Sequence, residues 1–319
     1  MKHLPTLLAA IVLSMPAFAT STWHTDFATA QKLAKAENKP IVLDFTGSDW
    51  CGWCITMRRQ VLDTPEFLAY ARETFVLMEV DLPHNTAKMT PQQLQQNREL
   101  MQRYQVEVFP TVLVISPDGE LLGGFAGGRT DLPSVRQPLE LACTNAALLQ
   151  QAATQNGTEK AETLHRFYRN IPARFRKNMP ELAKQIAALD PQNVTGIHTE
   201  LQELAVVQDI TDRTRTMNND EAIPVITEAL PEVSGTRRDN LLRMLSERLN
   251  SRIQHLRENA DTLADIEAMR QDNLLLIRYC VPEKSQYFAR ERVNSLFCNP
   301  QELLEQLRHE REERLKYKK

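Results

Sequence analysis

The stretch Asp44-Phe45-Thr46-Gly47-Ser48-Asp49-Trp50-Cys51-Gly52-Trp53-Cys54 decides the fold of this chain. It begins in the apolar, β-branched run 41–45, which predicts a buried strand, and it leads into a segment that predicts a helix. The first cysteine of the pair therefore stands at a helix N-terminus, where backbone N–H groups favour a thiolate. The second lies one turn further on, close enough to close a disulfide that can exchange with the disulfide of another protein.

A zinc site and a purely structural disulfide are the alternative interpretations of this cysteine pair. Zinc would require further Cys or His ligands at suitable spacing, and the sequence has no second C-x-x-C; His24 and His84 are the remaining candidates. A disulfide across two intervening residues removes little entropy from the unfolded chain. We therefore expect redox use of the pair without a metal or an organic cofactor, because the dithiol itself carries two electrons.

Strands and helices alternate around this motif. Apolar runs at 75–80 and 111–115 predict two further strands, and the turn 116–119 predicts a hairpin leading to a fourth strand at 120–125. Helical patterns lie between the strands, at residues 26–37, after Cys54, at 64–73 and at 91–104. This order predicts an α/β layer structure.

After about residue 137 the pattern changes to charged segments with apolar residues three and four positions apart. One such helical face carries Leu241, Leu242, Leu245, Leu249, Ile253 and Leu256. Further helices are expected at 181–189, 198–210, 286–297 and 301–315. We therefore predict an α/β domain at residues 20–144 and a mainly α-helical domain at residues 145–319.

The first 19 residues have the pattern of a secretory signal peptide. Lys2 precedes an apolar run, and Ala17-Phe18-Ala19 supplies small residues for cleavage after Ala19. The run is shorter than the roughly 20 residues that span a bilayer. We expect an exported, soluble protein of the periplasm, where disulfides persist. A formal net charge of -3 argues against nucleic acid as a partner.

Residues 44–54, together with Phe109-Pro110-Thr111, resemble the thioredoxin family. More narrowly, they are similar to exported bacterial thioredoxin-like proteins with a Cys-Gly-Trp-Cys site. The resemblance covers roughly residues 23–142 and does not extend into the helical half. It implies a thioredoxin fold, with a central mixed sheet flanked by helices, and a thiol:disulfide oxidoreductase that acts on protein substrates.

The resemblance also implies roles for three residues in the chemistry. Cys51 would be the more exposed, attacking thiolate, and Cys54 the buried thiol that resolves the mixed disulfide. Asp44 corresponds to the buried acid of the family, and a carboxyl desolvated there can hold a proton near neutral pH and act as base for Cys54 through a water molecule. The alternative for Asp44 is a carboxylate that faces solvent at a strand end.

Five further residues are expected to contact the substrate. By the resemblance, Pro110 is a cis-proline that faces the disulfide, and Phe109 beside it helps to select partners. Trp50 would lie beside the dithiol as an apolar contact surface, with ordinary core packing as its alternative. Gly52 and Trp53, between the two cysteines, complete the predicted contact surface.

The direction of electron transfer does not follow from the sequence. Gly-Trp stands between the cysteines in place of the Gly-Pro of reducing thioredoxins, and Ile55 stands where those often carry Lys. A membrane-linked redox partner is expected. Two other functions stay open: a disulfide isomerase whose helical domain forms a homodimer or holds misfolded substrates, and a non-enzymatic interaction module in which Cys51→Ala would leave function unchanged.

The other three cysteines give weaker signals. Cys280 and Cys298 are 18 residues apart and are candidates for a structural disulfide worth roughly 3 kcal/mol, if their Cα atoms are within reach. Cys143 is expected to be a buried, inert thiol. A basic cluster surrounds Pro172, and we expect a solvated helix face there rather than an anion site; it comprises His165, Arg166, Arg169, Arg174, Arg176 and Lys177.

Overall fold

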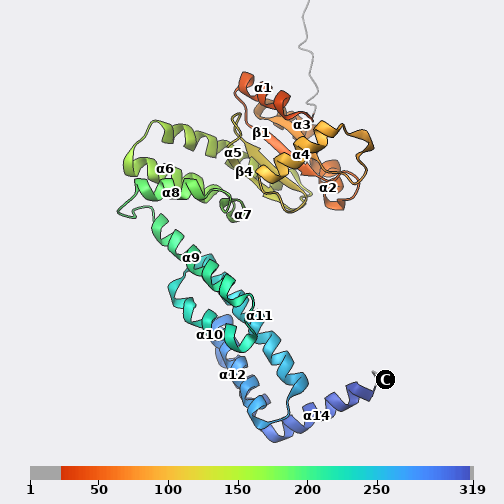
Figure 1. Cartoon of the computed structure of the whole chain (residues 1–319), viewed down its shortest axis with the longest axis vertical. Helices are drawn as coiled ribbons and strands as arrows, with labels where there is room; N and C mark the ends of the chain where they lie inside the picture. Colours follow the sequence, from red (N-terminus) through yellow and green to blue (C-terminus); the bar gives the residue numbers. More distant parts are fainter. Residues whose placement is uncertain (1–22, 317–319) are drawn as a thin grey trace, which may run out of the picture. The chain divides into compact units, whose positions relative to one another are not determined.

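The structure is a computed structural model that describes residues 23–316. The expected signal peptide at residues 1–19 lies outside the described residues. The chain forms two compact units, one ending at Thr195 and one beginning at Gly196, shown as a ribbon in Figure 1. The first unit contains the sheet, and the described part of the second unit is helical.

A four-stranded mixed sheet forms the centre of the first unit, with the strand order β2-β1-β3-β4. Its strands are β1 (Ile41–Thr46), β2 (Val76–Asp81), β3 (Thr111–Ile115) and β4 (Leu121–Ala126). β1 pairs parallel to β2 and antiparallel to β3, and β3 pairs antiparallel to β4. The predicted α/β fold with a central mixed sheet is confirmed.

Helices surround this sheet in the order α1 (Phe27–Glu37), α2 (Gly52–Met57), α3 (Pro65–Thr74), α4 (Pro91–Arg103) and α5 (Leu132–Ala153). A π-helical turn, η1 (Arg58–Leu62), continues α2, and a 3-10 turn, η2 (Thr86–Lys88), precedes α4. Local sequence fixes where α3 and α4 begin. Thr64 and Thr90 each accept a backbone N–H as the N-cap, and a proline follows each of them at the first helical position.

The first unit extends beyond the boundary predicted at residue 144, which falls inside α5. Three more helices belong to it: α6 (Gly157–Asn170), α7 (Ala173–Arg176) and α8 (Pro180–Leu189). The physical reason is a shared core, because Phe167, Ile171 and Phe175 pack in the same apolar cluster as the sheet. The buried Asn145 donates to Leu122 O at 2.7 Å and accepts from the Asn170 amide at 2.8 Å, so it joins α5 to β4 and to α6.

The second unit consists of α9 (Ile197–Thr214), α10 (Asn219–Ala229), η3 (Leu230–Glu232), α11 (Gly235–Asn259), α12 (Leu263–Cys280), α13 (Glu283–Leu296) and α14 (Pro300–Lys316). It has two apolar clusters, one centred on Leu241, Leu245 and Leu249 of α11 and one that includes Ile266 and Phe297. The prediction of a mainly helical C-terminal region is confirmed.

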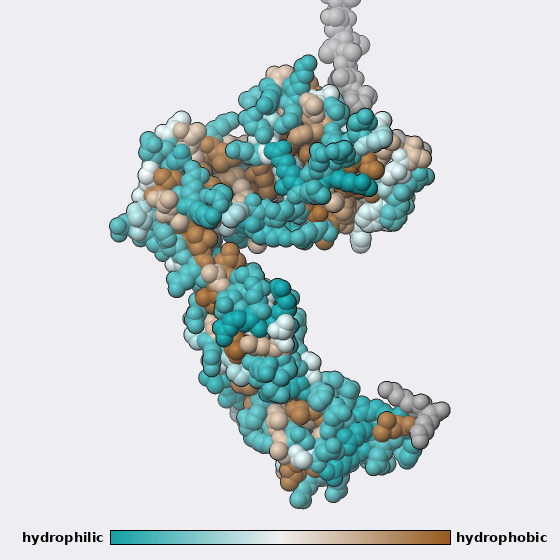
Figure 2. Space-filling view, in the orientation of Figure 1, coloured by the Kyte–Doolittle hydropathy of each residue, from teal (hydrophilic) through white to brown (hydrophobic). Residues whose placement is uncertain are grey.

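None of the helices within residues 23–316 is both long enough and apolar enough to cross a membrane. On the face seen in Figure 2, hydrophilic side chains cover most of the surface, and apolar residues form small separate groups.

Candidate active site

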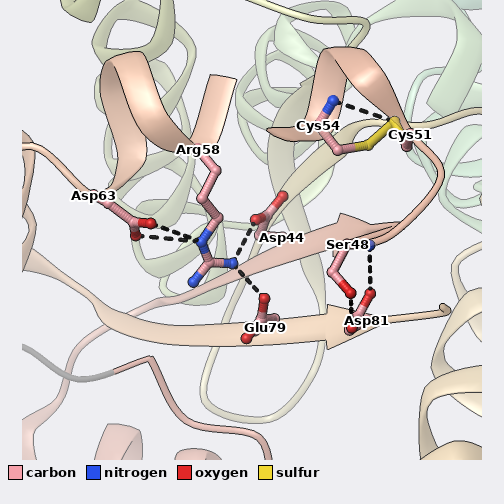
Figure 3. A network of polar contacts seen from close by, with 8 residues as sticks. All are labelled: Asp44, Ser48, Cys51, Cys54, Arg58, Asp63, Glu79 and Asp81. Atoms are coloured by element: carbon pink, nitrogen blue, oxygen red, sulfur yellow. Dashed lines mark hydrogen bonds and ion pairs between the residues drawn. A yellow bond between two sulfur atoms is a disulfide. The ribbon is translucent and has the colours of Figure 1, made fainter. Parts of the chain in front are cut away.

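The cysteine pair lies where the loop after β1 leads into α2. Cys51 is the N-cap of α2, and its Sγ accepts the backbone N–H of Cys54 at 3.2 Å. The two residues form a disulfide, and their Cα atoms are 5.2 Å apart. Cys51 is 7% exposed and Cys54 is 2% exposed, so Cys51 is the more accessible residue of the pair. Ser48, in the loop before them, donates its N–H and its hydroxyl to Asp81, which fixes that loop to the end of β2 (Figure 3).

Asp44 lies on β1, beneath this pair, and is fully buried. Its partner in the parallel register is Glu79 of β2, so two carboxyl groups stand side by side in the sheet. Arg58, the first residue of η1, donates from Nη1 to Asp44 Oδ2 at 3.2 Å and to Glu79 Oε1 at 2.6 Å. Its Nε also donates to Asp63 at 3.2 Å. One guanidinium therefore bridges three acids below the disulfide (Figure 3).

Burial controls the protonation of these acids. Loss of solvent raises the pKa of Asp44 to about 7; Arg58 opposes the rise, and Glu79 adds to it. Burial likewise raises the pKa of Glu79. Asp44 Oδ1 has no hydrogen-bond partner among residues 23–316. Asp44 is thus a carboxyl that can take up or release a proton near neutral pH and that keeps one oxygen free of protein donors.

A surface pocket of about 470 Å³ brings Cys54 and two of the three acids, Glu79 and Asp63, to one opening; Asp44 lies behind it and does not line it. Cys54, Arg58 and Glu79 all line it, together with Thr46, Ser48, Ile55, Arg59 and Asp63. A pocket of this size admits water. Protons can therefore move between Cys54, Glu79 and solvent without passing through the apolar core.

Aromatic side chains form the rim next to the disulfide. Trp50 stacks on His84 and meets Phe109 edge-on, with ring centroids 5.4 Å apart in both pairs. Its Nε1 donates to Leu82 O at 2.8 Å. The peptide bond between Phe109 and Pro110 is cis. The structure thus brings Phe109 into contact with Trp50, which directly precedes Cys51 in the chain.

Trp53 points outward and is 61% exposed. Gly128, in the loop after β4, lies against its ring, because a Cβ added there would come within 2.6 Å of the indole. Gly52 has open space around its Cα. Trp53 therefore offers an apolar surface next to the disulfide.

Sequence reasoning did not find Arg58 and Glu79. The available signals were a single acid in the apolar run 75–80 and an arginine one helical turn after Cys54. Neither signal shows that the side chains meet, because the meeting depends on the parallel register of β1 with β2.

The disulfide considered for Cys280 and Cys298 does not form: both are free, exposed thiols. Helix α13, whose 14 residues span about 20 Å, lies between them in the chain, whereas a disulfide needs Cα atoms within roughly 7 Å. Cys143 is also free and is half-buried, and burial raises the pKa of its thiol. Within residues 23–316, no group of three or more His, Cys, Asp or Glu side chains is arranged to hold a metal ion.

Comparisons with known proteins agree with this geometry. Residues 27–131 match the thioredoxin-like domain family. The disulfide bond reductase DsbH of Chlamydia pneumoniae is 38% identical over 129 residues, which cover 39% of this chain and 76% of that protein. The thioredoxin-related protein DsbJ of the same organism is 28% identical over 181 residues, which cover 53% of this chain and 50% of that protein.

A solved structure described as a DsbH oxidoreductase aligns with a TM-score of 0.37 and 31% identity, over 44% of this chain and 94% of that one. The residues matched by the family model include the Cys51–Cys54 segment. The chain therefore belongs to the thioredoxin-like family and is a thiol:disulfide oxidoreductase.

Proposed function

We propose that this protein is an exported reductase of protein disulfides. The observation that carries the proposal is the placement of the Cys51–Cys54 pair at the start of α2, above a buried Asp44 that titrates near neutral pH. The 38% identity to the disulfide bond reductase DsbH over 129 residues supports the reducing direction. The protein substrates, the compartment and the electron donor are parts of this proposal.

The proposed cycle has two exchange steps. The Cys51 thiolate attacks one sulfur of a substrate disulfide and expels the other as a thiolate, which takes a proton from solvent. Cys54 then gives its proton to the Asp44 carboxylate, and the resulting thiolate attacks Cys51 Sγ and expels the second substrate sulfur as a thiolate. That thiolate takes a proton from solvent, and Asp44 returns its own proton to solvent before the next turn. Two electrons have passed to the substrate, and the enzyme carries the Cys51–Cys54 disulfide. A dithiol of another protein, which we place on a membrane-linked redox partner, must reduce it for the next turn.

The equilibrium reduction potential of the Cys51–Cys54 couple tests the direction. The measurement uses the full chain with Cys143, Cys280 and Cys298 changed to Ser and thiol alkylation as the readout. We expect a value near that of thioredoxin, about -270 mV. A value of about -120 to -180 mV would assign an oxidant or an isomerase instead. A pair that does not titrate reversibly would overturn the catalytic role altogether.

Export has its own test. The pattern of residues 1–19 supports cleavage after Ala19. Mass spectrometry of the protein from a periplasmic fraction should find a mature chain that begins at Thr20. Intact protein confined to the cytoplasm would contradict the exported part of the proposal and leave the chemistry untouched.

A further inference from the structure

The helices added after α5 reach the loop that carries the cis-proline. Lys177, directly after α7, forms an ion pair with Glu107 at 2.8 Å, and the Asn178 amide donates to Tyr104 O at 3.3 Å. Arg174 of α7 lines a small pocket of about 120 Å³ together with Val108 and Thr111, the residues that flank Phe109–Pro110. The basic segment around Pro172 is therefore part of the surroundings of the substrate-binding loop.

The basic cluster is not one continuous solvated face. His165 is buried in α6, whereas Arg174 is exposed on α7. Arg174 also lines a second pocket, of about 340 Å³, which it shares with Arg129 and the β4 residue Phe125. The same arginine thus borders the cis-proline loop on one side and Arg129 on the other.

Arg129 belongs to the redox end of the fold. It follows Gly128, which lies against Trp53, and its guanidinium stacks on the Phe125 ring at 4.5 Å. Neither Arg129 nor Arg174 makes an ion pair with any residue in 23–316, and Arg129 Nε has no hydrogen-bond partner there. Stacking on an aromatic ring holds a guanidinium in place while its outer N–H donors remain available.

The acids near the two arginines are already engaged. Glu107 is held by Lys177, and Asp131 accepts the Ser134 N–H as the N-cap of α5. No acidic residue lines the pocket that Arg129 and Arg174 share. Arg174 and Arg129 also act on Glu107 and Asp131 at longer range, since their charges help to lower the pKa of these two acids. Neither acid forms an ion pair with them, so this edge presents two guanidinium groups next to the apolar surfaces of Trp53 and Val108, which are 61% and 40% exposed.

We propose that Arg129 and Arg174 form a recognition edge for protein substrates that carry an Asp or Glu side chain close to the cysteine under attack. The proposal rests on the proposed function, because the occupant is the polypeptide that lies along the Phe109–Pro110 loop during exchange. A carboxylate fits a guanidinium through two parallel hydrogen bonds, whereas a basic flank would meet like charge. The added helices thereby contribute to substrate choice at the redox site.

The test measures how fast the reduced full-length protein reacts with short peptide disulfides, with tryptophan fluorescence as the readout. The peptides share one uncharged sequence, in which a single Asp or a single Lys is moved along both sides of the cysteine. We expect the best Asp peptide to react roughly two- to fivefold faster than the uncharged peptide at low ionic strength, and the Lys peptide to react more slowly. Salt should reduce both differences.

Variants assign the effect to the two arginines. Arg174→Gln and Arg129→Gln should each weaken the Asp preference, Arg174→Lys should retain part of it, and Arg174→Glu should favour the Lys peptide. Arg98→Gln is the matched control, because Arg98 is exposed on α4 and lines neither pocket. The uncharged peptide should react at an unchanged rate in all of them, which also shows that each variant is folded.

Two outcomes would overturn this inference. One is an Asp preference that is equal in Arg174→Gln, Arg129→Gln and Arg98→Gln; the other is the same rate for every peptide in the unaltered protein. A protein that fails to react even with the uncharged peptide would instead contradict the proposed function.

Discussion

Asp44 keeps its proton in the folded protein over a pH range in which the unfolded chain would lose it. Burial moves its pKa from 3.8 to about 7. Between these values the unfolded chain releases a proton that the folded chain retains, so the contribution of Asp44 to stability falls as the pH rises from about 4 to about 7 and is level above. At neutral and alkaline pH the buried Asp44 carboxyl therefore lowers the free energy of unfolding.

Asp44→Asn should therefore stabilise the oxidised protein above pH 7, by about 2–4 kcal/mol, and this gain should shrink toward zero near pH 4. Urea unfolding followed by tryptophan fluorescence measures it at both pH values. The same variant should slow the release of substrate by Cys54 on the order of 10²-fold at neutral pH. An equal stability change at the two pH values would contradict the buried-acid assignment.

Arg58 acts on the chemistry through Asp44 and Glu79, as a positioning residue. Its positive charge lowers the pKa of both acids, so Arg58→Gln should raise them. We expect the pH profile of mixed-disulfide resolution to move upward by roughly 1 unit, with partial recovery in Arg58→Lys. Arg98→Gln, at an exposed position of α4 outside the pocket that Arg58 lines, is the control. A slower rate with an unmoved profile would assign Arg58 a structural role only.

The sequence was sufficient to predict site residues that belong to one motif. It was insufficient to predict site residues that come together only in the folded chain. Cys51, Cys54 and Asp44 belong to one continuous stretch, and their spacing could be read directly. Arg58 and Glu79 come from η1 and β2, and they meet Asp44 only because β1 and β2 pair in one particular register. A shift of that register by one residue would move Glu79 to the other face of the sheet.

Among the elements, the hairpin of β3 and β4 depends on a glycine. Gly124 has a φ of +139°, and a Cβ there would lie 2.2 Å from Val112 O and 2.8 Å from Leu113 Cα. Gly124→Ala should lower the free energy of unfolding by about 2 kcal/mol or more. Gly52→Ala, where the added methyl meets open space, is the control and should change it by less than about 1 kcal/mol. The urea midpoint measured by tryptophan fluorescence should be lower for Gly124→Ala than for Gly52→Ala. Equal midpoints would contradict the close contact of Gly124 with β3.

Element order was predictable from the sequence, but the end of the first unit was not. An apolar run in the sequence predicts each strand of the sheet, and turn residues predict the hairpin. Helix α5 has the same amphipathic pattern as the helices after it, so composition places a boundary inside it at residue 144. The residues that place α6 and α7 in the first unit, such as Phe167 and Phe175, have the sequence pattern of ordinary helical core residues. Only their contacts with the core of the sheet show where they belong.

In the whole molecule, the two units can be observed separately. The three tryptophans of the sequence, at positions 23, 50 and 53, all belong to the first unit. Tryptophan fluorescence therefore reports the first unit, whereas far-UV circular dichroism reports the helices of both.

The second unit contains a buried acid whose loss should separate these signals. Asp272 of α12 is fully buried and pairs with Arg252 of α11, which also reaches Asp220 of α10 at 2.7 Å. Asp272→Ala should destabilise this unit by about 3 kcal/mol, because it leaves the guanidinium without its buried partner. We expect an earlier loss of helical signal with an unchanged fluorescence midpoint, and no change in Glu267→Ala, whose side chain is exposed on the same helix. Midpoints that move together would show that the units unfold as one.

Asn145 determines how this chain can be recombined with other proteins. It bonds β4 through Leu122 and α6 through Asn170 from the middle of α5. A crossover placed inside α5, whether in a genome or in a cloning experiment, would leave buried polar groups unpaired on both fragments. A transplant of the redox module into a new host protein therefore has to carry α6, α7 and α8 with it, and the natural graft point is the junction between Thr195 and Gly196.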